Sequence, residues 1–82
     1  MSPIIEIDVH GLTAEQAVAK IEKLVDTADT SVYRIRVIHG FHGGTHIRDS
    51  IRRELGYGLV PKILRILPGS NQGITELVLR EY

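Results

Sequence analysis

Residues 4–11 read Ile4-Ile5-Glu6-Ile7-Asp8-Val9-His10-Gly11, and this alternating run, which ends in His-Gly, decides the fold. A second run of the same form reads Val32-Tyr33-Arg34-Ile35-Arg36-Val37-Ile38-His39-Gly40. Apolar residues recur at every second position in both runs, which is the period of a half-buried β-strand. We place Tyr33, Ile35 and Val37 on the buried face of the second strand and Val32, Arg34 and Arg36 on the other. The chain therefore begins with two similar strands that each end in a histidine.

A helical pattern follows each of these runs. After the first, Thr13 precedes Gln16 by three residues, which is the capping-box arrangement that starts a helix. Apolar residues then recur at helical spacing, at Ala14, Ala17, Val18, Ile21, Leu24, Val25 and Ala28. After the second run, a helix is expected over about residues 45–56, with Ile47, Ile51 and Leu55 on its buried side.

The rest of the sequence predicts two more strands, at about residues 62–67 and 74–80, joined by a turn at residues 68–73. Helical crossovers favour parallel pairing of the first three strands, and the short turn favours an antiparallel fourth. The expected fold class is α/β: a two-layer α/β sandwich in βαβαββ order, with a mixed four-stranded sheet and both helices on one face. Residues 1–82 are expected to form a single domain.

Composition narrows the classes of protein to consider. The chain has 82 residues, too few for a second core, and it has no cysteine, which excludes disulfides, thiolate metal sites and a cysteine nucleophile. The sequence lacks any apolar run of the roughly 18 residues that a membrane span needs, so we expect a cytoplasmic protein without a membrane partner.

The net charge of zero hides an asymmetry along the chain. Residues 1–30 hold two lysines against six acidic residues, whereas residues 31–82 hold eight basic and four acidic residues. Most of the basic excess lies at Arg34, Arg36, Arg48, Arg52, Arg53, Lys62 and Arg65. Such a patch can bind phosphates, although a set of solvated surfaces that segregate by sign is the alternative interpretation.

Parallel strands that are linked by a helix bring their carboxyl ends to one edge of the sheet, so Asp8, His10 and His39 are expected to lie close together. The glycine-rich segment that follows His39, with the helix start behind it, is typical of an anion site. The predicted nucleic-acid-binding residues are Gly40, Gly43, Gly44, Thr45, Arg48 and Arg52. The alternatives are a local Asp8–His10 pair that only orients the turn, and a His39 that is packed and bonded to backbone.

These two strand ends also resemble motifs of the small MutS-related (Smr) domain family. Its first motif, Leu-Asp-Leu-His-Gly, is similar to residues 7–11, and its second, His-Gly-x-Gly-x-Gly-x-Leu-Arg, is similar to residues 39–48. A weaker third signature resembles the glycine-initiated segment at residues 73–79. The second motif departs from the pattern because His42 stands where a glycine is expected and one additional residue precedes Ile47-Arg48.

The resemblance implies a nucleic-acid-processing domain. Members of the family are associated with nicking DNA or cleaving RNA, and some act on mRNA at stalled ribosomes, so DNA, RNA and a ribosome-associated setting are the expected partners. The implied fold resembles the C-terminal domain of bacterial translation initiation factor three, which agrees with the βαβαββ order. That fold also includes RNA-binding modules without catalytic activity.

Two mechanisms of phosphodiester cleavage fit the residues. In a metal-free mechanism, His10 and His39 act as the acid–base pair, Asp8 fixes the tautomer of one of them, and Arg48 with loop amides stabilises the developing charge. In the other, Asp8 and His10 hold a divalent cation, Mg²⁺ or Mn²⁺, that activates water.

The competing classes need no catalysis. A nucleic-acid-binding module would grip the backbone with the second helix, the loop and exposed Arg34, Arg36 and Lys62. A small protein-interaction domain is the third class, because few aromatic residues are present for stacking on bases.

Overall fold

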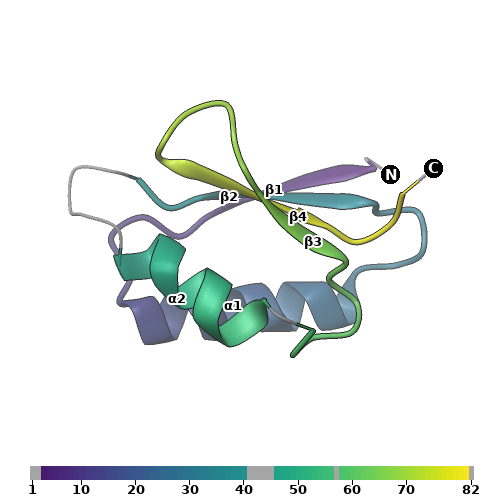
Figure 1. The fold of residues 1–82 in the computed structure, drawn as a ribbon, viewed down its shortest axis with the longest axis horizontal. Coiled ribbons are helices and arrows are strands. Elements are labelled where there is room, and N and C mark those ends of the chain that lie inside the picture. The colour runs from purple at the N-terminus through teal and green to yellow at the C-terminus, as the bar shows by residue number, and fades with distance from the viewer. Residues whose placement is uncertain (1–2, 41–45, 57, 82) are drawn as a thin grey trace.

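The computed structural model describes residues 3–40, 46–56 and 58–81. Its elements follow the predicted βαβαββ order. They are β1 (Ile4–Asp8), α1 (Ala14–Thr27), β2 (Arg34–Ile38), α2 (His46–Leu55), β3 (Arg65–Pro68) and β4 (Ile74–Val78), as Figure 1 shows. Neither of these helices has the length and apolar character required to cross a membrane.

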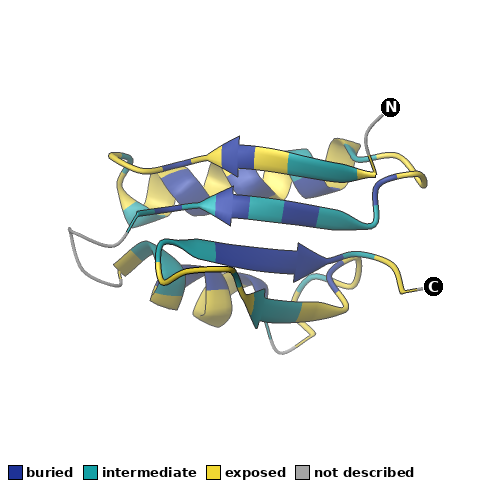
Figure 2. Cartoon of the chain, turned by 90° about the horizontal axis from the view of Figure 1, so that it is seen from above, coloured by how far each residue is buried: buried dark blue, intermediate teal, exposed yellow. Residues whose placement is uncertain are grey.

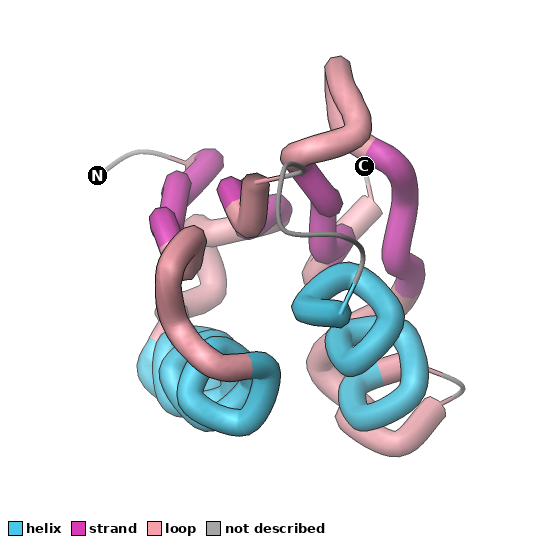
Figure 3. Tube along the Cα trace, turned by 90° about the vertical axis from the view of Figure 1, so that its left-hand side faces the viewer, coloured by secondary structure: helices cyan, strands magenta, loops and turns pink. Residues whose placement is uncertain are grey.

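The elements form two layers, which confirms the predicted α/β sandwich. Both helices lie on the same face of the four-stranded sheet, with α1 beneath β1 and β2 and α2 beneath β3 and β4 (Figure 3). The two helices also pack against each other. The opposite face of the sheet carries no helix among the described residues, as expected from its charged positions.

The strand order is β1-β2-β4-β3, visible from above in Figure 2. Parallel pairing of β1 with β2 is confirmed, but the predicted pairing of the third strand with the second is wrong. Instead, β4 lies between β2 and β3 and is antiparallel to both. The central position suits β4 because Thr75, Glu76, Leu77 and Val78 are all buried. Pro68, which lacks an amide proton, lies in the edge strand, where proline is tolerated.

The core lies between the sheet and the helices. Thr13 and Gln16 form the predicted capping box at the start of α1. The core's fully buried large side chains include Val9, Ile21, Ile35, Val37, Ile51, Leu55 and Leu77. Val32, which the alternation assigned to the arginine face, is 1% exposed and belongs to this core. It precedes β2 in a turn in which its amide donates to the Asp29 carbonyl, so the alternation of the strand does not extend to it.

Ion pairs occupy the open face of the sheet. Glu76 of β4 accepts from Arg34 and Arg36 of β2, each at 3.4 Å, and Arg36 also pairs with Glu6 of β1. The negative charge of Glu76 is the main cause that raises the pKa of Arg36. The expectation that these two arginines are exposed cations is therefore wrong, because they are half-buried and paired with carboxylates, Arg34 with Glu76 and Arg36 with Glu76 and Glu6.

Lys62, which was predicted to bind phosphate, contacts the backbone of α1. The predicted third strand at residues 62–67 begins three residues later, at Arg65, and Lys62 precedes it. The Lys62 ammonium donates to the Asp26 carbonyl at 2.9 Å and the Val25 carbonyl at 3.5 Å. It thereby satisfies carbonyls in the last turn of α1, where a cation is favourable.

Candidate functional site

Three strand ends meet at one edge of the sheet. Because β1 and β2 are parallel and β4 is antiparallel, the carboxyl ends of β1 and β2 lie beside the start of β4. The amide of Val9 donates to the Ile38 carbonyl at 2.9 Å, which continues the β1–β2 pairing to the histidines. The amides of His39 and Gly40 both donate to the Gly73 carbonyl, at 2.9 and 3.1 Å. The predicted convergence of the two His-Gly segments is therefore present.

Asp8 and His10 form an exposed pair at this edge. His10 Nδ1 lies 2.5 Å from Asp8 Oδ1, and the His10 amide donates to the same oxygen at 3.0 Å. The His10 side chain is 70% exposed and the Asp8 side chain is 52% exposed. The side-chain hydrogen bond from His10 is the main reason that the pKa of Asp8 lies below its ordinary value, so this carboxyl remains ionised at neutral pH.

This contact defines the chemistry of the His10 ring. An ionised carboxylate can only accept, so Nδ1 of His10 carries the proton that it donates to Asp8. The neutral ring therefore has its lone pair on Nε2, which has no hydrogen-bond partner in the part of the chain that is described. An oriented imidazole with a free basic nitrogen, open to a macromolecule, can take a proton from a nucleophile.

His39 differs from His10 in burial and partners. It is 7% exposed, its Nδ1 lies 2.9 Å from the Gly40 carbonyl, and its Nε2 lies 2.8 Å from the Thr75 hydroxyl. Because a carbonyl only accepts, Nδ1 donates, and Nε2 of the neutral ring accepts from Thr75. Both ring nitrogens are thus occupied within the protein, in the packed arrangement that its position on the apolar face of β2 suggested.

Gly40 lies between the two histidines. Its φ is +79°, in the left-handed region that favours glycine, and a Cβ built there would lie 3.5 Å from the Cβ of His10. Its amide, predicted to bind phosphate, donates instead to the Gly73 carbonyl. Gly40 therefore shapes the site by its conformation and its closeness to His10.

The start of α2 supplies the nearby cations. Arg48 lies in its first turn, half-buried, with its Nε 3.6 Å from Asp49 Oδ1. Arg52 is exposed one turn further along the helix and makes no ion pair with any described residue. Gly43, Gly44 and Thr45 lie outside the described residues, so their predicted contacts stay predictions.

Two residues that sequence reasoning did not select contribute to the site. Thr75 is fully buried and holds Nε2 of His39, and the Gly73 carbonyl anchors the two amides that follow β2. A Cβ on Gly73 would lie 3.4 Å from the Gly40 backbone, an ordinary contact, and 3.2 Å from Asn71 Oδ1. The signal was Gly73, which precedes the last predicted strand and begins the third motif, with a threonine two residues later.

The described residues hold no group of three or more histidine, aspartate, glutamate or cysteine side chains that could bind a metal ion. A divalent cation at this edge would find Asp8 and His10 as its ligands from that part of the chain, and Mg²⁺ usually binds proteins through one or two carboxylates while it keeps several waters. The predicted Mg²⁺ or Mn²⁺ thus has two protein groups to bind here.

Comparisons with known proteins agree with the fold and the motifs. The Smr domain family model matches residues 7–76. The structure is similar to the crystal structure of the Smr domain of Thermus thermophilus MutS2, with a TM-score of 0.80 and 23% sequence identity over 94% of this chain and 99% of that chain. None of the curated protein sequences matches the chain. Since the family model spans most of the sequence, including both His-Gly segments and the start of β4, the chain belongs to the Smr domain family.

Proposed function

We propose that this domain is an endonuclease that cleaves a phosphodiester bond of DNA or RNA with the Asp8–His10 pair at the sheet edge. The observation that carries the proposal is the 2.5 Å contact between Asp8 Oδ1 and His10 Nδ1, which leaves the Nε2 of an exposed histidine free. The chain belongs to the Smr domain family, whose association with nucleases and nucleic-acid binding further supports nucleic acid as the substrate.

In this mechanism His10 Nε2 takes the proton of the nucleophile, which is a ribose 2′-hydroxyl in RNA or a water molecule in DNA. Asp8 holds the ring in the productive tautomer and stabilises the imidazolium that forms, as the acid of a catalytic triad does. The attacking oxygen bonds to phosphorus, the bond to the leaving oxygen breaks, and solvent protonates that oxygen. Arg48, at the start of α2, would offset negative charge on the phosphoryl oxygens.

For His39 we propose a positioning role instead of the predicted role as the second proton carrier. Its two ring nitrogens bind the Gly40 carbonyl and the Thr75 hydroxyl, so it holds the end of β2 against β4. The two roles differ in the pH–rate profile. Loss of a proton donor in His39→Ala would remove one limb of the profile, whereas loss of a positioning residue lowers the rate and keeps the shape.

The proposal is tested by incubating the purified protein with labelled single-stranded RNA and with supercoiled plasmid, with and without EDTA. Cleavage of either substrate by the wild type, lost in His10→Ala and kept in His46→Ala, is the expected result, since His46 is an exposed histidine with no part in the pair. Cleavage that persists in His10→Ala would contradict the proposal, and loss of activity in EDTA would replace the metal-free mechanism with the cation-assisted one.

A nucleic-acid-binding module is the second candidate, and one observation favours it. Of the two histidines predicted to share the proton transfers, only His10 is exposed, because His39 is buried with both nitrogens occupied. Such a module would bind both substrates in the experiment above without cutting either one. Binding without cleavage would therefore select this candidate.

A further inference from the structure

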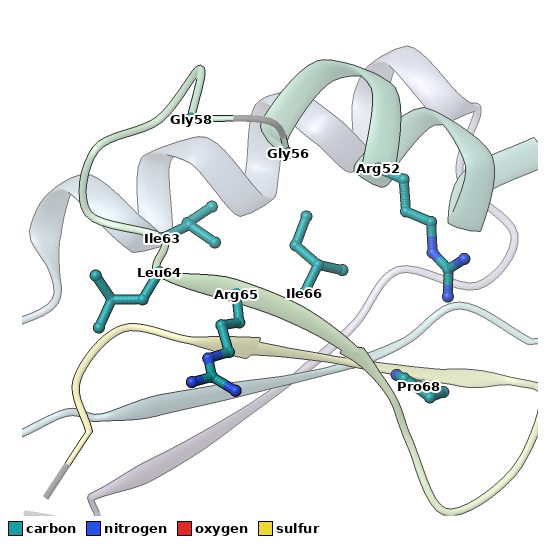
Figure 4. Close-up of a pocket in the computed structure, with 8 residues that line it drawn as sticks. All are labelled: Arg52, Gly56, Gly58, Ile63, Leu64, Arg65, Ile66 and Pro68. Atoms are coloured by element: carbon teal, nitrogen blue, oxygen red, sulfur yellow. The ribbon is translucent and has the colours of Figure 1, made fainter.

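A hollow of about 530 Å³ lies away from the strand ends that carry Asp8, His10 and His39. It lies between the C-terminal half of α2 and the edge strand β3. Figure 4 shows the residues that line it, among them Arg52, Gly56, Leu64, Arg65, Ile66 and Pro68. Its volume falls within the roughly 300–1,000 Å³ of ordinary ligand sites. Neither Asp8, His10 nor His39 lines it, so it is separate from the site described above.

The lining combines cations with apolar side chains. Arg52 enters the hollow from α2 and Ile66 of β3 is directed toward the helix, whereas the side chain of Arg65 turns away from the helix on the other side of β3 (Figure 4). Leu64 at the same hollow is 55% exposed and therefore offers apolar surface to a ligand. A nucleotide matches this combination because its phosphate binds guanidinium groups while its base and ribose contact apolar surface.

A peptide that adds a strand to β3 would fit the hollow less well. The strand has only four residues, Arg65–Pro68, and its proline has no amide proton to donate to an added strand. A short edge that carries a charge and a proline is typical of strands that resist such pairing. The chemistry of the hollow therefore favours nucleic acid over an extended peptide.

The helix α2 extends from the region of the proposed cleavage site to the hollow. Arg52 lies four residues after Arg48, on the same face of the helix and about 6 Å further along its axis. That helix begins at the sheet edge where β1 and β2 end (Figure 1). A strand whose cleaved phosphate is near Arg48 can reach Arg52 with the next nucleotides.

We propose that this hollow and the outer side of β3 form a subsite for the nucleotides that flank the cleaved bond, with Arg52 in the hollow and Arg65 on the outer side of the strand binding backbone phosphates and with Leu64 and Ile66 contacting the base or ribose. The inference rests on the proposed function only in taking a nucleic-acid strand as the ligand. It adds Arg65 and Leu64 to the interaction surface, and neither residue belongs to the Asp8–His10 site.

The C-terminal segment of the chain regulates this subsite through Glu81. Arg65 Nε lies 2.6 Å from Glu81 Oε1, and a second guanidinium nitrogen donates to Glu81 Oε2 at 3.3 Å. A carboxylate thus occupies the two donors that a phosphate would use. Both side chains are about half-exposed, so exchange of this surface ion pair for a phosphate costs little.

The test measures the affinity of the full protein for 3′-fluorescein oligothymidylates of about three and about twelve nucleotides by fluorescence anisotropy. Arg65→Ala should weaken binding of the long probe about threefold to tenfold and leave the short probe unchanged. The slope of log affinity against log salt should fall by about 0.7 for the lost phosphate contact. Lys23→Ala, which removes an exposed charge from α1, is the matched control and should change the affinity for either probe less than about twofold.

Glu81→Gln should have the opposite effect. Because it frees the Arg65 guanidinium, it should strengthen binding of the long probe about twofold to threefold. Glu22→Gln, at an exposed position of α1, is its matched control and should leave the affinity unchanged. Equal effects of the two glutamine substitutions would mean that only net charge matters, and that result would overturn the role of Glu81.

Failure of the subsite and failure of the proposed function give different results. If Arg65→Ala binds the long probe as Lys23→Ala does, the subsite is wrong, whether or not the wild type cleaves its substrate. If long-probe binding depends on Arg65 but nothing is cleaved, the subsite stands and the domain is a binding module. Binding of an oligoglutamate peptide that depends on Arg65, without any such dependence for the long probe, would overturn the subsite in favour of a peptide.

Discussion

Replacing Thr75 by valine tests how the site is held together. Valine has nearly the shape of threonine but lacks the hydroxyl that lies 2.8 Å from Nε2 of His39. Thr75 is fully buried and His39 is 7% exposed, so water cannot replace the lost partner without opening the structure. An unsatisfied buried polar group costs about 1–3 kcal/mol, and we expect Thr75→Val to lower the free energy of unfolding by that amount.

This loss is large for so small a domain. For chains of this size, each 1 kcal/mol lowers Tm by about 4–8 °C, so the change is easily measured by circular dichroism during heating and by urea titration. A double-mutant cycle with His39→Leu isolates the hydrogen bond from other effects of the substitutions. The coupling energy should be about 0.5–3 kcal/mol, because removing both partners is less costly than stranding one of them. Additive effects of the two substitutions, or a Thr75→Val variant as stable as the wild type, would refute the reasoning.

Three further predictions concern the backbone, a titration and the open face. Gly40→Ala should lower the free energy of unfolding, measured in urea, by about 1–2 kcal/mol, because an alanine is strained at a φ of +79°. The new Cβ would add no clash, since its nearest contact is an ordinary one at 3.5 Å. Unchanged stability would show that the left-handed conformation at residue 40 is not required. The pKa of the Asp8 carboxyl, measured by NMR, should lie below its ordinary value and move back toward that value in His10→Ala, because the hydrogen bond from the His10 side chain is the main cause of the lowered pKa. Since the folded pKa is depressed, the stabilisation from this pair is present above the unfolded pKa and is lost as pH falls through the folded one, so the two proteins should converge in stability in acid. Glu76→Gln should destabilise the protein by about 1–2 kcal/mol at low salt and by less in about 1 M salt. The reason is that the arginine partners of Glu76 on β2 are one-third exposed, so salt can screen the ion pairs. A loss of stability that does not depend on salt would contradict an electrostatic cause.

Much of the fold could be predicted because local patterns determine it. The alternation at residues 4–9 predicts a strand, and the structure has β1 there. The Thr13 cap and the apolar stripe that follows it predict a helix, and the structure has α1 there. The position of β4 could not be predicted from such patterns. A β3–β4 hairpin can pair with β2 through either of its strands, and the choice depends on which strand can be buried on both faces. With the structure in view, Pro68 in β3 marks the edge strand.

The candidate site could be predicted where its contacts are local. Asp8 ends β1 and His10 follows it by two residues, so their pairing is a local contact that the spacing predicts. The partner of His39 could not be found in this way. Thr75 is 36 residues away in sequence, and its contact with His39 exists only because β4, not β3, lies beside β2. The error in strand order and the missed threonine therefore have the same cause.

The same dependence explains the charged residues. Arg34 and Arg36 were predicted to be exposed because they alternate with the apolar face of the second strand. Their partner Glu76 lies on β4, directly opposite Arg36 in the sheet register. Arg48 and Arg52 needed no such information, because spacing along one helix is sufficient to place them on the same face.

The central claim is that Asp8 and His10 act as one catalytic unit, and a kinetic double-mutant cycle tests it most directly. Single-turnover cleavage rates are measured for the wild type, Asp8→Asn, His10→Ala and the double variant, on whichever nucleic acid the wild type cleaves. Asparagine keeps an oxygen acceptor for the His10 amide, so the turn is preserved while the carboxylate is lost. We predict that His10→Ala lowers the rate by about 10²–10⁴-fold and that the double variant is no slower than His10→Ala alone, because Asp8 acts through the imidazole. Rate losses that multiply in the double variant, or a His10→Ala protein that cleaves at the wild-type rate, would contradict the account.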